Sequence, residues 1–149
     1  MRPSITRTFT TTAPPERVHD YLADFRNAEE WDPGTKTCDL VQGGGEVGSV
    51  YRNVSSFMGR ESEIRYTVAE LERPTRIHLV GRNEQFEGHD VLGVRAGVDG
   101  GSEVTYHAEF SFTGAAKYAA PLVAAYLPAL ARKTIRQMQA CLDALGDGR

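Results

Sequence analysis

The sequence has little of several features that define common protein classes. Its two cysteines, Cys38 and Cys141, are far apart and lack CxxC spacing, so neither a disulfide framework nor a zinc site is indicated. No apolar run approaches the roughly 18 residues of a membrane span. The N-terminus lacks the apolar core of a signal peptide. From these absences we expect a reduced, cytoplasmic protein without stable membrane insertion.

Charge of one sign is also lacking, because the formal net charge is only −3 and the basic residues are scattered. Nucleic-acid binding usually requires a clustered basic face, so we expect no nucleic-acid partner. The densest basic group is Arg132-Lys133 with Arg136, and it falls on a helical segment whose polar face explains it.

Motifs for catalysis and cofactor binding are scarce. The four histidines, His19, His78, His89 and His107, show no metal-ligand spacing, and no GxSxG motif occurs. The stretch 43–48 matches GxGxxG, but a strand follows it in place of the helix that a dinucleotide site needs. We therefore predict no metal and no cofactor, and interpret the glycines as a hairpin loop.

The chain of 149 residues suits one domain, which we assign to 1–149. The first strand is expected at 4–12, a short helix after Ala13, and a helical turn at 27–31. Further strands are expected at 36–42, 48–57, 60–71, 76–83, 86–97 and 102–113. Short connections, such as the turn at Met58-Gly59, make neighbouring strands antiparallel. The pattern predicts an α+β fold with six to seven strands and no parallel doubly wound sheet.

The last segment, at about 115–145, is expected to be helical. One apolar stripe recurs every three or four residues. Its members are Tyr118, Leu122, Tyr126, Leu130, Thr134, Met138, Leu142 and Leu145. Pro128 is interior, where proline removes a backbone hydrogen bond and clashes with the preceding turn, so we expect a kink or a break near it.

Three stretches carry a family resemblance. They are the opening strand followed by Ala13-Pro14-Pro15-Glu16-Arg17-Val18, Leu22-Ala23-Asp24 and Trp31; Val47-Gly48-Ser49-Val50-Tyr51; and Gly101-Ser102-Glu103-Val104-Thr105-Tyr106 before the closing helix. Over about residues 3–146 the chain resembles the START-like superfamily, in particular its polyketide cyclase/dehydrase and lipid transport branch. The resemblance implies a helix-grip fold, in which a curved antiparallel sheet wraps around the long C-terminal helix and leaves a cavity between them.

Strand parity predicts which side chains face that cavity, because alternate residues point to opposite faces of a sheet. We expect the ligand-facing set to include Trp31, Arg52, Tyr66, Asn83, Asp90, Leu92, Tyr106, Phe110, Tyr118, Leu122 and Tyr126. Parity places His78, His89 and His107 on the outer face. Strand 48–57 is ambiguous, and we favour Val50, Arg52 and Val54 facing inward over Tyr51 and Asn53.

Two of these residues allow more than one interpretation. Asp90 either meets Arg52 inside the cavity and orients a polar ligand group, or lies in water at a frayed strand end. Trp31 either plugs the junction of helices and sheet or forms a wall of the cavity.

Three functions remain open from the sequence. The first is binding or carrying a hydrophobic small molecule such as a lipid, polyketide or isoprenoid. The second is a polyketide cyclase or aromatase-like enzyme, for which Asp90, Arg52, Tyr66 and Tyr106 are weak catalytic candidates. The third is a protein-interaction or chaperone-cofactor module, which the lack of an apolar stripe outside the predicted core disfavours. The oligomeric state, monomer or dimer, is not determined by the sequence.

Overall fold

A computed structural model describes residues 2–57 and 59–146, so Met58 of the expected turn lies outside the described residues. The elements agree closely with those expected from the sequence. They are β1 (Ser4–Thr11), α1 (Pro15–Ala23), η1 (Phe25–Asn27), α2 (Ala28–Trp31), β2 (Thr35–Gln42), β3 (Val50–Phe57), β4 (Arg60–Glu72), β5 (Arg76–Arg82), β6 (Phe86–Ala96), η2 (Val98–Gly100), β7 (Ser102–Phe112), η3 (Gly114–Ala119) and α3 (Ala120–Asp143).

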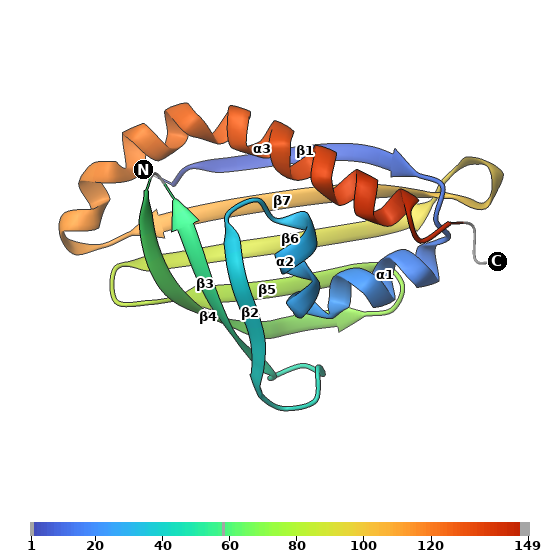
Figure 1. Ribbon diagram of the computed structural model, residues 1–149, viewed down its shortest axis with the longest axis horizontal. Helices are drawn as coiled ribbons and strands as arrows, with labels where there is room; N and C mark the ends of the chain where they lie inside the picture. The colour runs from blue at the N-terminus through green and yellow to red at the C-terminus, as the bar shows by residue number, and fades with distance from the viewer. Residues whose placement is uncertain (1, 58, 147–149) are drawn as a thin grey trace.

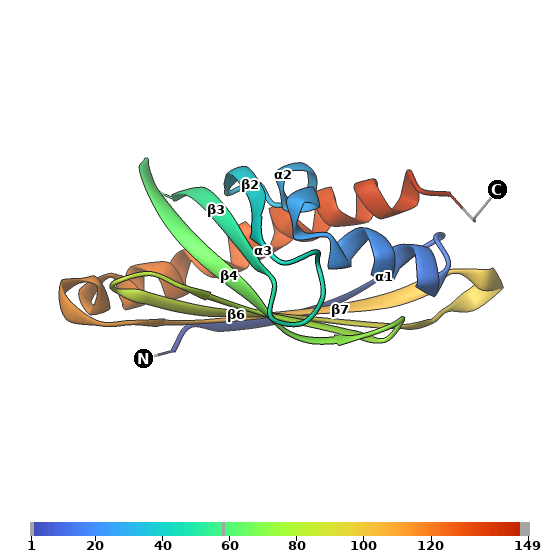
Figure 2. The same ribbon diagram turned by 90° about the horizontal axis from the view of Figure 1, so that it is seen from below.

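The strands form one curved sheet with α1, α2 and α3 on its concave side (Figures 1 and 2). It has seven strands in the order β1-β7-β6-β5-β4-β3-β2, and every neighbouring pair is antiparallel. The first strand therefore pairs with the last. This arrangement confirms the predicted helix-grip architecture.

The short helix α1 follows directly from its sequence. Pro15 stands in the first turn, where its missing N–H is not needed, and Glu16 suits the positive end of the helix. Val18 and Leu22, four residues apart, are both completely buried. This face anchors α1 on the sheet, and the chain then turns through η1 into α2.

Phe25, in η1, lies at the centre of an aromatic core. Its ring is 4.8 Å from that of Tyr66, 5.9 Å from that of Tyr51 and 6.1 Å from that of Trp31, measured between centroids. Trp31 in turn meets Tyr106 edge to face at 6.0 Å. These rings fill the space beneath α1 and α2, so this half of the concave side is packed.

The long helix α3 lies over the edge strand β1, and Figure 1 shows the two elements side by side. Leu127 and Ala131 pack against Ile5 and Ala108. The buried stripe of α3 runs through Ala120, Val123, Leu127, Ala131, Thr134, Met138 and Leu142.

The expected stripe is correct for the second half of α3 and wrong for the first half. Tyr118, Leu122 and Tyr126 are 78%, 54% and 44% exposed. Leu122 and Tyr126 lie one residue out of phase with Val123 and Leu127, which are the buried side chains in this part of the helix. Three large apolar side chains are therefore exposed along the N-terminal part of the helix and η3. The expected absence of an apolar stripe outside the core is wrong on this point.

Pro128 does not break α3, which runs from Ala120 to Asp143 as one helix. The side chain of Pro128 is exposed, so its ring faces away from the sheet. The predicted break is therefore wrong. Figure 1 shows η3 and the first turns of α3 running at an angle to the remainder of the helix.

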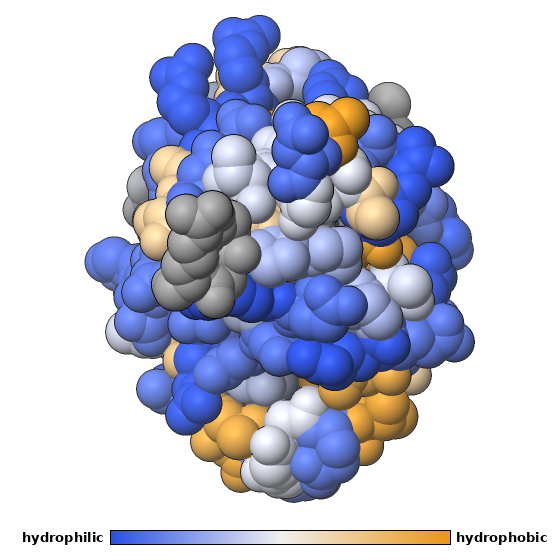
Figure 3. All heavy atoms as spheres, turned by 90° about the vertical axis from the view of Figure 1, so that its right-hand side faces the viewer, coloured by the Kyte–Doolittle hydropathy of each residue, from blue (hydrophilic) through white to orange (hydrophobic). Residues whose placement is uncertain are grey.

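The surface toward the C-terminal end of α3 is largely hydrophilic (Figure 3). An apolar area at the bottom of this view coincides with the β2–β3 hairpin, which carries the exposed Val41 and Val47. Gly43, Gly45 and Gly48 in this hairpin adopt φ of 83°, 107° and 93°, which favour glycine. The hairpin confirms that the glycines form a turn before a strand.

Candidate functional site

The concave face of β6 and β7 carries the side chains that parity predicts. Pairing places Leu92 opposite Tyr106 and Asp90 opposite Ala108. Along β6 the inner positions read Phe86, Gly88, Asp90, Leu92 and Val94, of which the last four are buried. Leu92 belongs to the dense core, whereas Phe86 at the other end of the strand is only half-buried.

Asp90 places a carboxylate side chain in the buried part of this face. It is 7% exposed, and its Oδ1 accepts a hydrogen bond from the Tyr106 hydroxyl at 2.9 Å. The residue lies in the middle of β6, so the interpretation as a frayed end in water is wrong. Its partner is a tyrosine of the neighbouring strand, so the expected pairing with Arg52 is also wrong.

Burial raises the pKa of Asp90 from 3.8 to about 7, because the surrounding core disfavours the charged carboxylate. The hydrogen bond from Tyr106 opposes this effect, and the nearby Asp32 carboxyl adds to it. Burial likewise raises the pKa of Tyr66 and of Tyr106 well above the ordinary value. The interior thus holds an acid that exchanges its proton near neutral pH.

Asp32 follows α2 and turns toward the same interior. Its two carboxyl oxygens accept hydrogen bonds from the Gly34 amide and the Thr35 hydroxyl, each at 2.9 Å. Burial raises the pKa of Asp32, and its charge raises those of Asp90, Tyr66 and Tyr106. Sequence reasoning missed this residue, because an aspartate before Pro-Gly reads as ordinary turn chemistry.

Trp31 is 1% exposed and packs between Phe25 and Tyr106, so it lies in the core. Within the described part of the chain, its indole N–H is buried without a hydrogen-bond partner. An unsatisfied buried donor costs about 1–3 kcal/mol, which a ligand or a water molecule recovers on binding. Trp31 therefore packs in the core, as the first of its two interpretations expects, and its role as a wall of the cavity stays a prediction.

The preferred facing of β3 is wrong. Tyr51 and Asn53 are each 1% exposed, and they pair with Tyr66 and Ile64 of β4 on the concave side. Asn53 is tolerated there because its amide donates to the Thr35 hydroxyl at 3.0 Å. Arg52 points to the outer face and forms an ion pair with Glu63.

Asn83 also lies outside the concave site. It is exposed at the end of β5, where its side-chain oxygen accepts the Gln85 amide at 3.0 Å and its nitrogen donates to the Glu63 carbonyl at 3.3 Å. It thus shapes the β5–β6 turn. The expected position of Asn83 in the cavity is wrong.

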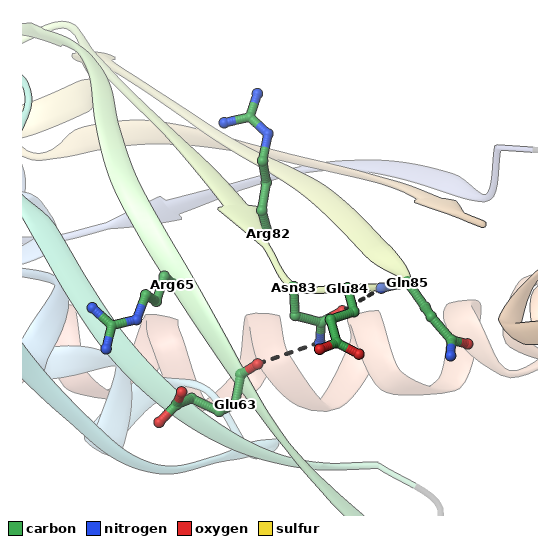
Figure 4. A pocket seen from close by; sticks show the side chains of 6 residues that line it. All are labelled: Glu63, Arg65, Arg82, Asn83, Glu84 and Gln85. Carbon is green, nitrogen blue, oxygen red and sulfur yellow. Dashed lines mark hydrogen bonds between the residues drawn. The ribbon is translucent and has the colours of Figure 1, made fainter. Parts of the chain in front are cut away.

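A surface hollow of about 510 Å³ adjoins this turn, lined by Glu63, Arg65, Arg82, Asn83, Glu84 and Gln85 (Figure 4). Figure 4 shows the side chains of Arg65 and Arg82 extending away from one another, so they do not converge on one point. A second hollow, of about 330 Å³, lies along Thr8, Gly93 and Thr105. Neither is lined by α3, Asp90 or Tyr106, so the apolar cavity implied by the family resemblance stays a prediction.

The outer face holds His78, His89 and His107, as parity predicts. His78 and His89 are joined by a hydrogen bond of 2.9 Å between their rings. Glu70 accepts from His78 at 3.3 Å and Glu87 from His89 at 3.0 Å. This network lies on the opposite side of the sheet from Asp90.

Three half-buried phenylalanines, Phe86, Phe110 and Phe112, lie on the concave face beyond Asp90; we call them the aromatic floor. The Phe86 ring lies 5.7 Å from that of Phe110 and 5.6 Å from that of Phe112. They face the same side as the core yet keep part of their surface in solvent. Apolar surface of this kind is available for a ligand.

One flank of α3 carries three apolar side chains that keep part of their surface exposed; we call Leu122, Tyr126 and Leu130 the helix flank. Their spacing of four residues places them on one side of the helix. Leu130 packs against the cluster of Ile5 and Ala108, which Phe110 of the floor also joins. The Tyr126 ring meets that of Phe57, an inner-face residue of β3, at 5.5 Å. The helix flank therefore meets the inner face of the sheet at two places, Phe57 of β3 and the cluster that includes Phe110 of β7.

Two paired glycines make room for the rings. A Cβ added to Gly81 would stand 2.5 Å from the Tyr66 ring, and one added to Gly88 would stand 2.6 Å from the Phe86 ring. The two glycines face each other across β5 and β6. Tyr66 and Phe86 therefore lie flat over glycines that the sequence alone does not mark as part of a site.

Replacing Gly81 with alanine is expected to displace the Tyr66 ring and to lower the free energy of unfolding by about 1–3 kcal/mol. Gly93→Ala is the matched control, since its Cβ would meet only Thr105 at 4.0 Å. Urea unfolding of the two variants measures the difference. Equal stabilities would show that Tyr66 is free to move off Gly81.

Comparison with known proteins gives the family. Residues 2–147 match the family described as polyketide cyclase / dehydrase and lipid transport. The chain belongs to this family. No curated protein sequence matches it.

Solved structures agree on the fold. A START superfamily protein from Mycobacterium smegmatis has a TM-score of 0.78 at 12% identity, covering 95% of this chain and 98% of that one. The protein TTHA0849 from Thermus thermophilus has a TM-score of 0.77 at 16% identity, covering 96% and 99%. The ginseng major latex-like protein 151 from Panax ginseng has a TM-score of 0.68 at 13% identity, covering 95% and 98%. This family member thus has the START helix-grip fold.

Among the described residues, no helix combines the length and the apolar character needed to span a bilayer.

Proposed function

We propose that this protein binds a hydrophobic small molecule, such as a lipid, polyketide or isoprenoid, between the aromatic floor and the helix flank. The observation that supports the proposal is the half-buried floor of Phe86, Phe110 and Phe112, which faces the concave side and keeps part of its surface exposed. Membership of a family named partly for lipid transport is consistent with it. Burying such surface contributes roughly 25 cal/mol per Å².

The polar end of the site lies deeper, at Asp90, Tyr106 and Trp31. Asp90 lies two inner positions from Phe86 along β6, which is roughly 13 Å at the usual rise of a strand. A ligand that extends along β6 would set its apolar part on the floor and its polar group at Asp90. The free indole N–H of Trp31 is a further donor beside Tyr106.

Tyr126→Asp is expected to weaken binding of Nile red, a neutral apolar dye, by about tenfold, because it places a charge where the ligand needs apolar contact. Val98→Asp is the control, since Val98 is 83% exposed and lies in η2, at the end of β6 and β7 away from the aromatic floor. Fluorescence titration of the dye measures both. Wild-type affinity in both variants, or no saturable binding by the wild type, would contradict the proposal.

A second candidate, a cyclase-like enzyme, is favoured by one observation. Asp90 titrates near neutral pH and contacts Tyr106, which is the arrangement of a general acid–base group. Such a group would exchange the α-protons of a bound ketone. Wild type is then expected to accelerate deuterium uptake by 2-dodecanone, followed by NMR, and Asp90→Asn to abolish the acceleration. If deuterium uptake with the wild type is no faster than in buffer alone, the enzyme candidate is contradicted and binding remains the proposed function.

A further inference from the structure

The charged groups of the molecule are divided between its two faces. Arg52, Arg65 and Arg82 lie on the outer side of the sheet, where Arg52 pairs with Glu63 and Arg82 with Glu87. Arg7 on β1 and Arg60 on β4 share the inner side by register, but both are exposed at the surface. The Arg7 guanidinium donates a hydrogen bond to the Thr6 carbonyl at 2.9 Å. Within the described residues, no lysine or arginine is buried.

The groups that face the interior are acids. Asp90 comes from β6, Tyr106 from β7, Tyr66 from β4 and Asp32 from the turn after α2. The charge of Asp32 raises the pKa of Asp90, and Asp90, Asp32 and Tyr66 all raise the pKa of Tyr106. From α3 the buried polar group is the Thr134 hydroxyl, which donates to the Leu130 carbonyl at 2.9 Å. His19, the buried histidine, lies against the Arg76 carbonyl at the far end of β5.

We infer that the site selects a ligand whose polar group is neutral or cationic, such as an alcohol or an amine, and rejects a carboxylate. This rests on the proposed function and names the class of ligand that the same site takes. A carboxylate placed beside Asp90 would meet a second anion in a dry environment, and among the described residues no buried guanidinium or ammonium neutralises it. A hydroxyl can donate to Asp90, and an ammonium can form an ion pair with it.

The test compares three probes that share one alkyl chain, namely dodecanol, dodecylamine and dodecanoate, each below its micelle concentration at pH 8. Emission from Trp31, the only tryptophan, reports binding because its ring packs on Tyr106. We expect dodecylamine and dodecanol to bind, and dodecanoate to bind at least about tenfold more weakly than dodecanol. Asp90→Asn should remove most of the discrimination against dodecanoate and the advantage of the amine.

Dodecanoate binding as tightly as dodecanol would overturn the inference while leaving the proposed function intact. An unchanged selectivity in Asp90→Asn would overturn the assignment of the effect to Asp90. Failure of all three probes to bind would overturn the proposed function and the inference together. Tyr106→Phe provides a second variant, since it keeps the carboxylate but removes its donor, and should retain the rejection of dodecanoate.

Discussion

Replacing Phe25 with alanine is expected to lower the free energy of unfolding by about 3–5 kcal/mol, the usual cost of removing a buried phenylalanine. Phe25 is 1% exposed, and its ring contacts those of Trp31, Tyr51 and Tyr66. The cavity that alanine leaves would separate α1 and α2 from β3 and β4. Chemical denaturation followed by circular dichroism gives the magnitude.

The control for this variant is Val98→Ala, which truncates an exposed apolar side chain in η2. Its effect should stay within about 0.5 kcal/mol. A loss below about 1 kcal/mol in Phe25→Ala would show that the aromatic cluster repacks around the cavity. In that case the packed half of the concave side would be less rigid than its geometry indicates.

Asp90→Asn is expected to make the protein more stable at alkaline pH, by up to about 4 kcal/mol. The pKa of Asp90 is about 7 when folded and has its ordinary value of 3.8 when unfolded, so folding favours the protonated form. This stabilisation is complete below pH 3.8 and is lost as pH rises through 7. The difference between the two pKa values corresponds to about 4 kcal/mol. Asparagine does not ionise and still accepts from Tyr106.

Unfolding by urea between pH 4 and pH 9 measures this effect as the difference between variant and wild type. The difference should be small at pH 4 and should grow to its full value above pH 8. Asp39→Asn, which changes an exposed aspartate on β2, is the matched control. A difference that does not change with pH would show that Asp90 ionises freely in the folded protein.

Local patterns in the sequence predict most of this fold. Short connections and alternating strands predict the antiparallel sheet, and the apolar spacing of Val18 and Leu22 predicts α1. The family resemblance adds the placement of the long helix on the concave side. The antiparallel hairpins and α1 depend on residues close together in the chain, which is why periodicity is informative about them.

The errors arise where packing between segments distant in the sequence decides which face of a strand or helix is buried. Val50 and Val54 favoured one facing of β3, yet pairing with β4 buries Tyr51 and Asn53, the latter satisfied by Thr35. On α3, Leu122 and Tyr126 suggested the buried stripe, but Val123 and Leu127, each one residue further along, are buried instead. Both phases of the helix carry apolar residues, so periodicity alone does not choose between them.

The candidate site shows the same limit. Strand parity correctly placed Asp90, Leu92, Tyr106 and Phe110 on the concave face. It did not identify the hydrogen bond from Tyr106 to Asp90, because the register between β6 and β7 fixes which side chains meet. Nor did it identify that Gly81 and Gly88 lie beneath Tyr66 and Phe86, because parity gives the face of a glycine but not the ring that lies over it.

The pairing of β1 with β7 determines when this fold is completed during synthesis. β1 is the first of these strands to leave the ribosome, but its neighbour in the sheet is made almost last, just before α3. Until then β1 has open hydrogen-bonding groups along both edges, and the apolar residues that α3 covers are exposed. A chain truncated before β7 would retain an unpaired strand prone to aggregation, so a chain that extends through α3 is the unit to express and to protect from proteolysis.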